Sequence, residues 1–104
     1  MNIDYTTVKE LKDAGFPLRE LVEYSNFKDI QKYVIEIDGN IYYIPTLSDL
    51  IEACGEGFTA LVNVYDDVWF AGELDVEDSF KRGYGEGKTP EEAVAKLWLA
   101  LNKT

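Results

Sequence analysis

The sequence predicts a single α+β domain over residues 1–104, because helical and strand patterns alternate along a chain with room for one core. Apolar positions recur at helical spacing near both ends, and they alternate with a period of two in the middle. The links between the predicted strands are short, which favours antiparallel pairing. We therefore expect a mostly antiparallel sheet of four to five strands, flanked by short N-terminal helices, a short central helix and a C-terminal helix.

Two short helices are expected near the N-terminus. Thr7 and Glu10 have the spacing of a capping box, apolar residues follow at helical spacing, and Gly15 gives a stop. Phe16-Pro17 is then expected to begin a second helix with the apolar positions Leu18, Leu21 and Val22. The stretch Ser25–Lys32 is ambiguous, although Phe27 and Ile30 lie three apart and suit another helical turn.

A β-hairpin and the central helix are expected next. The alternation from Tyr33 to Asp38, the turn signal Asp38-Gly39-Asn40 and the return strand Ile41–Ile44 predict the hairpin. Thr46 with Asp49 predicts a helix cap, an apolar stripe ending at Cys54 follows, and Gly55 is expected to end the helix.

The last part of the chain predicts a second hairpin and the C-terminal helix. Its strands are Thr59–Tyr65 and Val68–Leu74, joined at Asp66-Asp67, and Ser79–Tyr84 suits one more strand. We expect Gly83–Gly87 to be a flexible connection. Thr89-Pro90-Glu91-Glu92 is the clearest local signal, since it combines an N-cap, a proline at the first helical position and acids at the positive end of the helix dipole.

Negative charge is concentrated in the middle of the chain. The net charge is −10, and the 48 residues from Tyr33 to Phe80 contain eleven acids and no lysine or arginine. Such a protein is not expected to bind nucleic acid directly, since phosphate binding needs a basic face. The acids suit either a merely solubilising surface or a carboxylate array for a basic partner. For the second interpretation, the candidate partner-binding residues are Asp66, Asp67, Trp69 (as an anchor), Glu73, Asp75, Glu77 and Asp78.

Several chemistries are disfavoured. The chain has no histidine and one cysteine, so the usual general base, the usual zinc ligands and an internal disulfide are missing. A calcium loop over Asp75–Asp78 lacks the required glycine and closing glutamate. Gly83–Thr89 looks like a phosphate-binding loop, but Arg82 stands where that pattern needs its first glycine. We expect no catalytic residues, no metal, no cofactor and no membrane segment, and Cys54 is expected in the core.

The aromatic residues on the predicted strands leave two alternatives open. Tyr42 with Tyr43, and Trp69 with Phe70, are adjacent pairs, so one member of each pair points away from its neighbour. Either helices cover both faces of the sheet and all these rings are core, or some rings, Tyr65 included, form an exposed patch among acids. The second composition is typical of a protein-binding hot spot.

The run Val68-Trp69-Phe70-Ala71 and the later run Gly85–Val94 into Leu97–Leu101 resemble the ending of the phage ABA-sandwich type of domain, found in small uncharacterised phage and prophage proteins. The resemblance covers residues 68–102, and the segment Ile44–Gly55 is also similar to segments of such proteins. A weaker similarity is to the HicB-like antitoxin domain. The phage family has no assigned catalytic residues, so the resemblance implies none here.

These observations together predict a non-enzymatic phage or prophage accessory protein in the cytoplasm of a bacterial host. Its partner would be a host protein with a basic surface, and its activity could be anti-defence inhibition, against CRISPR or restriction systems, by mimicry of nucleic acid. One alternative is an antitoxin-like module that neutralises a small basic toxin. Another is a small-molecule-binding or sponge protein. The oligomeric state stays open, because the edges of a small sheet could pair in a homodimer.

Overall fold

The computed structural model describes residues 3–21, 33–74 and 80–102. These residues contain three α-helices, one 3-10 turn and five strands. In chain order they are α1 (Tyr5–Asp13), β1 (Val34–Ile37), β2 (Asn40–Tyr43), α3 (Leu47–Cys54), η2 (Gly55–Gly57), β3 (Ala60–Tyr65), β4 (Val68–Leu74), β5 (Phe80–Gly87) and α4 (Pro90–Leu101). The predicted single-domain α+β class is confirmed.

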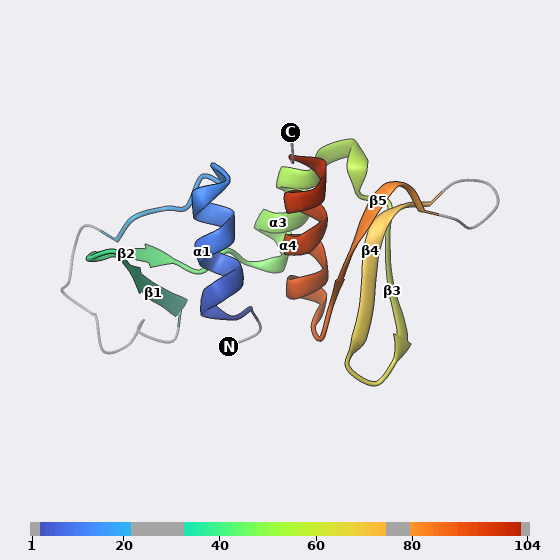
Figure 1. Ribbon diagram of the computed structural model, residues 1–104, viewed down its shortest axis with the longest axis horizontal. Coiled ribbons are helices and arrows are strands. Elements are labelled where there is room, and N and C mark those ends of the chain that lie inside the picture. The colour runs from blue at the N-terminus through green and yellow to red at the C-terminus, as the bar shows by residue number, and fades with distance from the viewer. Residues whose placement is uncertain (1–2, 22–32, 75–79, 103–104) are drawn as a thin grey trace.

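The strands pair antiparallel, but they form two sheets instead of one. One sheet has the order β1-β2 and the other the order β3-β4-β5. They lie toward opposite ends of a molecule that measures 51 × 31 × 19 Å, with α1, α3 and α4 between them (Figure 1). The helices separate the sheets because α4 packs against α3 and α1 as well as against the three-stranded sheet.

Helix α1 begins earlier than the sequence predicts. Its N-cap is Asp4, whose carboxylate accepts a hydrogen bond from the Thr7 backbone N–H at 2.9 Å, so the expected Thr7–Glu10 capping box is wrong. Thr7 is 2% exposed, and its hydroxyl donates instead to Glu92 of α4 at 2.8 Å. The Thr7 side chain, which the sequence predicts as a local cap, therefore makes a tertiary contact with α4 instead.

The second N-terminal helix is absent from the described part of its expected span. The backbone after Phe16 runs beside β2, where Leu21 N–H donates to Ile41 at 2.8 Å and Tyr43 N–H donates to Arg19 at 2.8 Å. Pro17 explains the difference, because the residue before a proline disfavours the α region and proline has no N–H to donate. Val22 and the ambiguous stretch Ser25–Lys32 lie outside the described residues.

The β1–β2 hairpin and helix α3 are confirmed. Asp38 and Gly39 have φ angles of 51° and 88°, the pair of positive values that a two-residue hairpin turn of type I′ needs. At the start of α3, Thr46 and Asp49 form a reciprocal capping box, with bonds of 3.1 and 3.0 Å. Gly55 ends the helix with a φ of 56°.

The β3–β4 hairpin is confirmed, and β5 extends further than expected. Asp67 has a φ of 59° in the predicted turn. The expected flexible connection Gly83–Gly87 is wrong, because these residues belong to β5. A Cβ on Gly85 would overlap the backbone of α4 at Ala93 and Leu97, and a Cβ on Gly87 would lie 2.7 Å from the Ala93 nitrogen. The glycines thus let the strand lie directly against the helix.

The core is centred on α4, and this helix begins at the predicted N-cap. Thr89 accepts a hydrogen bond from the Glu92 N–H at 3.1 Å, and Pro90 lies in the first turn. Five residues of the helix are buried: Ala93, Val94, Ala95, Leu97 and Trp98. Cys54 is 8% exposed in this core, as predicted. Burial raises the pKa of its thiol to about 11, so the sulfur stays protonated at neutral pH.

Candidate functional site

The two faces of the three-stranded sheet differ completely in what covers them. Leu61, Ala71 and Gly85 stand opposite one another on the face toward α4, which we call the inner face, and Ala71 is fully buried there. The neighbouring row, Val62 with Phe70 and its β5 partner, points to the other side. Figure 1 shows α4 on the inner side and no described element on the other.

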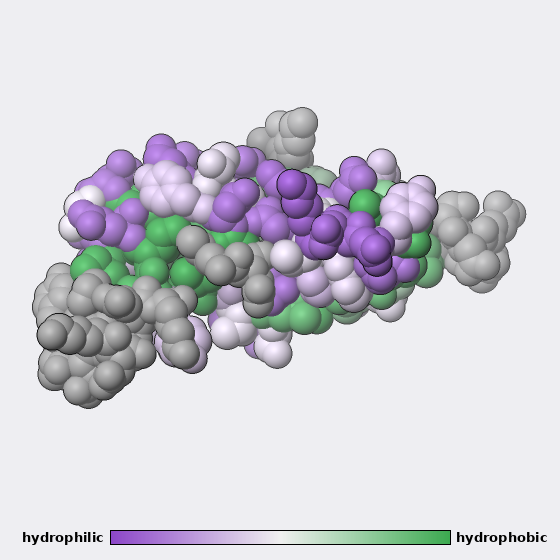
Figure 2. All heavy atoms as spheres, turned by 90° about the horizontal axis from the view of Figure 1, so that it is seen from below, coloured by the Kyte–Doolittle hydropathy of each residue, from purple (hydrophilic) through white to green (hydrophobic). Residues whose placement is uncertain are grey.

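We call the uncovered side the outer face and define it by Val62, Tyr65, Phe70 and Tyr84. Val62 is 39% exposed, Tyr65 is 69% exposed and Tyr84 is 51% exposed. The Phe70 and Tyr84 rings contact each other with centroids 5.3 Å apart. Hydrophobic atoms are visible among hydrophilic ones at this end of the molecule in Figure 2. The outer face is therefore an exposed patch of aromatic and aliphatic side chains, the second of the two sequence alternatives.

Acidic side chains border one end of the outer face. Asp66 and Asp67 are exposed in the β3–β4 turn, directly after Tyr65. Glu86 is exposed on β5 and stands opposite Phe70 in the register. The basic residue nearest to Glu86 in the sequence is Lys88, just beyond the end of β5. This border therefore carries an excess of negative charge beside apolar surface.

Of the remaining predicted site residues, the two that the structure describes, Glu73 and Trp69, do not join this group. Glu73 is partly buried near the far end of β4, roughly 20 Å from the turn at about 3.3 Å per strand residue. Trp69 belongs to the inner face and packs against the core. Asp75, Glu77 and Asp78 lie outside the described residues. The structure thus brings together Asp66, Asp67 and the outer face.

Tyr84 is the site residue that the sequence analysis missed. The sequence predicts that Tyr84 ends a strand and is followed by a flexible connection, whereas the strand continues through Gly85 and Gly87. An aromatic residue that alternates with glycines could have been the signal. Small residues on one side of a strand indicate a close neighbour there, and the side chain between them must point the other way.

The other acids of the central region fall into two further groups. Glu36 and Asp38 are exposed on the β1–β2 hairpin, and exposed carboxylates also lie on α3 and η2. Ion pairs between described residues join Lys9 to Asp13 and Lys96 to Glu10, at 3.8 and 3.6 Å, and neither involves a central acid. The exposed central carboxylates that the structure describes lie in three separate groups, on the β1–β2 hairpin, on α3 with η2 and in the β3–β4 turn, and these groups do not form one continuous array.

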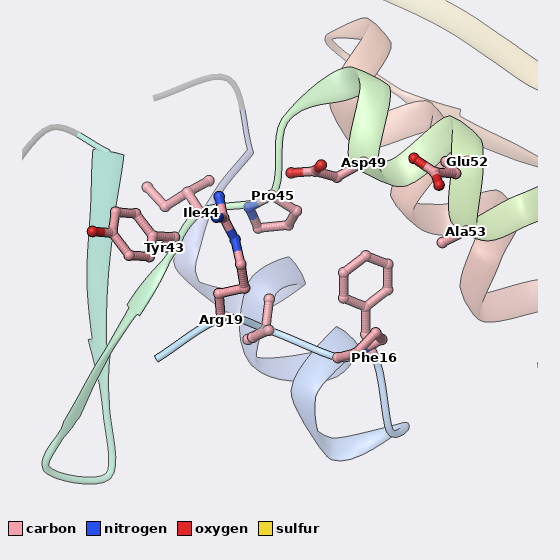
Figure 3. A pocket seen from close by; sticks show the side chains of 10 residues that line it. Phe16, Arg19, Tyr43, Ile44, Pro45, Asp49, Glu52 and Ala53 are labelled. Atoms are coloured by element: carbon pink, nitrogen blue, oxygen red, sulfur yellow. The ribbon is translucent and has the colours of Figure 1, made fainter. Parts of the chain in front are cut away.

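A pocket lies between the extended segment that follows α1, the end of β2 and helix α3. Its volume is about 380 Å³. It is lined by Phe16, Pro17, Leu18, Arg19, Tyr43, Ile44, Pro45, Asp49, Glu52 and Ala53. Figure 3 shows the Arg19 side chain on the β2 side and the two carboxylates on the α3 side. Sequence analysis missed this pocket because its walls come from three separate segments.

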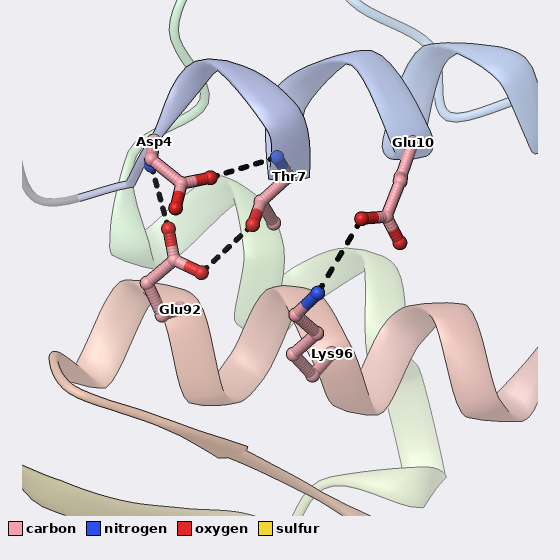
Figure 4. A network of polar contacts seen from close by, with 5 residues as sticks. All are labelled: Asp4, Thr7, Glu10, Glu92 and Lys96. Atoms are coloured by element: carbon pink, nitrogen blue, oxygen red, sulfur yellow. Dashed lines mark hydrogen bonds and ion pairs between the residues drawn. The ribbon is translucent and has the colours of Figure 1, made fainter.

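A network of polar contacts joins α1 to α4 and is structural. Both carboxylate oxygens of Glu92 accept hydrogen bonds, from the Asp4 N–H at 2.6 Å and from the Thr7 hydroxyl at 2.8 Å (Figure 4). Lys96 and Glu10 add an exposed ion pair one turn further along. Hydrogen bonding from the Thr7 N–H lowers the pKa of Asp4 below its usual value of 3.8. The contacts of this network cap α1 and hold it against α4.

Comparisons with protein-family models, with curated proteins and with solved structures find no match to this chain. The resemblance to the phage ABA-sandwich and HicB-like domains therefore stays a prediction. Within the described residues, no helix is both long and apolar enough to cross a membrane. The same residues contain no group of three or more histidine, cysteine or acidic side chains arranged to hold a metal ion.

Proposed function

We propose that this chain is a non-enzymatic binding protein that docks onto a partner protein through the outer face. The observation that carries the proposal is the contrast in exposure: the sheet is closed by α4 on its inner face, while Tyr65 and Tyr84 stand 69% and 51% exposed on the other. Tyrosine supplies a large, rigid contact area and is enriched in interface hot spots. Contiguous exposed apolar surface costs solubility, so a partner is a reason for keeping it.

The chemistry of the border indicates the chemistry of the partner. Asp66, Asp67 and Glu86 place negative charge beside the outer face, and the whole chain carries −10. A partner that combines a basic rim with an apolar centre matches this surface, and the opposite charges would speed association. We propose a host protein of this kind, with the chain acting as a phage or prophage accessory protein.

An anti-defence role is the most concrete form of this proposal. Host proteins that cut or hold nucleic acid have basic surfaces for the phosphate backbone, and an acidic border can compete for them. Among the described residues the exposed carboxylates form three separate groups, which favours a local contact at the β3–β4 turn over an extended imitation of a nucleic-acid strand. Inhibition would then come from covering part of a basic groove.

The experiment compares capture of host proteins by three forms of the chain. Wild type, the outer-face variant Tyr65→Ser/Tyr84→Ser and the control variant Tyr5→Ser are immobilised in a host lysate at low and high salt. Tyr5 is a suitable control because it is 44% exposed on α1, away from the sheet. We expect a protein that wild type and Tyr5→Ser retain and that the outer-face variant loses. Equal retention by all three forms would contradict the proposal.

A charge reversal tests the acidic border separately. Asp66→Lys and Glu36→Lys change the net charge equally, but Glu36 is on the β1–β2 hairpin at the other end of the molecule. With the captured protein purified, Asp66→Lys is expected to slow association and to weaken its dependence on salt. Glu36→Lys should change both only slightly. The same loss in both variants would show that only the total charge matters.

A further inference from the structure

We propose that the pocket between Arg19 and helix α3 binds a small zwitterion with an apolar body, as in a free amino acid with an aromatic or large aliphatic side chain. The proposal is independent of docking on the outer face, because the pocket lies on the other side of α4 from the three-stranded sheet (Figures 1 and 3). Its evidence is the placement of charge, the apolar walls and the way each wall is held.

Opposite charges line opposite sides of this pocket without neutralising each other. Arg19 projects from the extended segment, whereas Asp49 and Glu52 project from consecutive turns of α3 (Figure 3). Among the described residues no ion pair within 4.0 Å joins Arg19 to either carboxylate. A guanidinium binds a carboxylate and a pair of carboxylates binds an ammonium group. A ligand with both groups would satisfy both sides at once.

The surfaces between the charges are apolar. Phe16, Pro45 and Ala53 line the pocket, and Figure 3 shows the Phe16 ring below the space that separates Arg19 from α3. A volume of about 380 Å³ lies in the range of small-ligand sites, which combine mostly apolar walls with a few polar groups. The body of the ligand should therefore be aromatic or a large aliphatic group.

The walls are held before any ligand arrives. The carbonyl of Arg19 accepts from the Tyr43 N–H at 2.8 Å, and its guanidinium lies over the Tyr43 ring, 5.1 Å from the centroid. On the opposite side, the capping box fixes Asp49 through its 3.0 Å contact with the Thr46 N–H. Groups that are already ordered lose little entropy on binding, which favours affinity.

Calorimetry with three related probes tests the ligand class. The probes are L-phenylalanine, L-phenylalaninamide, which lacks the carboxylate, and 3-phenylpropionate, which lacks the ammonium group. We expect L-phenylalanine to bind roughly tenfold more tightly than either analogue, because each analogue leaves one side of the pocket unsatisfied. Equal or tighter binding of an analogue, or no binding of L-phenylalanine at millimolar concentration, would overturn the proposal.

Two substitutions then assign the ends of the ligand. Arg19→Gln should lower the affinity for L-phenylalanine to about that for the amide, and Glu52→Gln should lower it toward that for 3-phenylpropionate. Glu56→Gln is the matched control, because Glu56 is exposed on η2 and does not line the pocket. Asp49 is left intact since it also caps α3. Thermal melting of each variant shows that it is folded, and unchanged affinity in Arg19→Gln and Glu52→Gln would contradict the assignment.

Discussion

The inner and outer faces of the three-stranded sheet differ in what lies over them. On the inner face Ala71 and Gly85 allow α4 to approach until a single added methyl group would overlap its backbone. On the outer face Tyr65 and Tyr84 are 69% and 51% exposed, with no described element above them. One sheet therefore combines a face that has no room for an added methyl group at Gly85 with a face that carries large, exposed side chains.

This difference separates stability from binding. Side chains on the inner face are needed for the fold, since they set the distance between sheet and helix. Side chains on the outer face contribute little to the core, so their size and aromatic character call for another explanation, which we propose is a partner. Substitutions on the two faces should have different consequences, and the following predictions test that separation.

The largest effect on stability is expected from Gly85→Ala. The new Cβ would meet the backbone of Ala93 and Leu97, which cannot move without displacing α4. We expect a loss of about 4 kcal/mol in the free energy of unfolding, measured by urea denaturation. Glu86→Ala, at the next position and on the exposed side, is the control and should change stability by less than about 0.5 kcal/mol. Equal stability of both variants would contradict the account of the inner face.

The outer-face variant Tyr65→Ser/Tyr84→Ser should show the reverse pattern. With the captured partner purified, its affinity should fall by at least tenfold, equivalent to about 1.4 kcal/mol or more. Its urea midpoint should stay close to that of wild type, apart from a small loss from the Tyr84–Phe70 contact. A large drop in the midpoint with unchanged affinity would reverse the roles that we assign to the two faces.

Thr7→Val tests the tie between α1 and α4. Valine has nearly the same shape, but it cannot donate to Glu92 and leaves that carboxylate oxygen without its 2.8 Å partner. We expect a loss of about 1–2 kcal/mol in unfolding free energy and no change in partner affinity. The neighbouring Thr6 is exposed, so Thr6→Val is the control and should be nearly neutral. A loss in partner affinity would show that binding extends beyond the outer face.

A smaller, pH-dependent effect is expected from Asp4→Ala. The cap should be worth about 1 kcal/mol at neutral pH. The Thr7 N–H lowers the pKa of Asp4 in the folded state, so this contribution is complete above the unfolded pKa and is lost as the pH falls through the lower folded value. Urea midpoints of wild type and Asp4→Ala should therefore converge below about pH 4. A gap that persists at low pH would show that the charge of Asp4 does not matter.

Local signals in the sequence correctly predicted helix caps and turns, because these features depend on residues that are neighbours in the chain. Thr46 with Asp49, Asp38-Gly39 and Thr89-Pro90 each determine a cap or a turn within four residues, and all three are confirmed. Asp66 and Asp67 were also predicted as part of the candidate site, because acids are concentrated in a middle part of the chain that has no lysine or arginine.

Features that depend on distant partners could not be predicted. Gly85 and Gly87 have the composition of a flexible loop, and only the presence of Ala93 beside them shows that they serve packing. Thr7 has the spacing of a cap, but its hydroxyl donates to Glu92, which is 85 residues away in the sequence. The pocket and the uncovered outer face have the same origin, since both depend on how whole elements are placed relative to one another.

Methyl resonances offer the most direct test of the division between the two faces. Val62 lies on the outer face, whereas Val94 is fully buried in α4. When the captured partner is added to isotope-labelled protein, we predict that the Val62 methyl signals shift or broaden while those of Val94 stay in place. Val62 signals that remain unchanged while the complex forms would contradict the claim that the outer face is the docking surface.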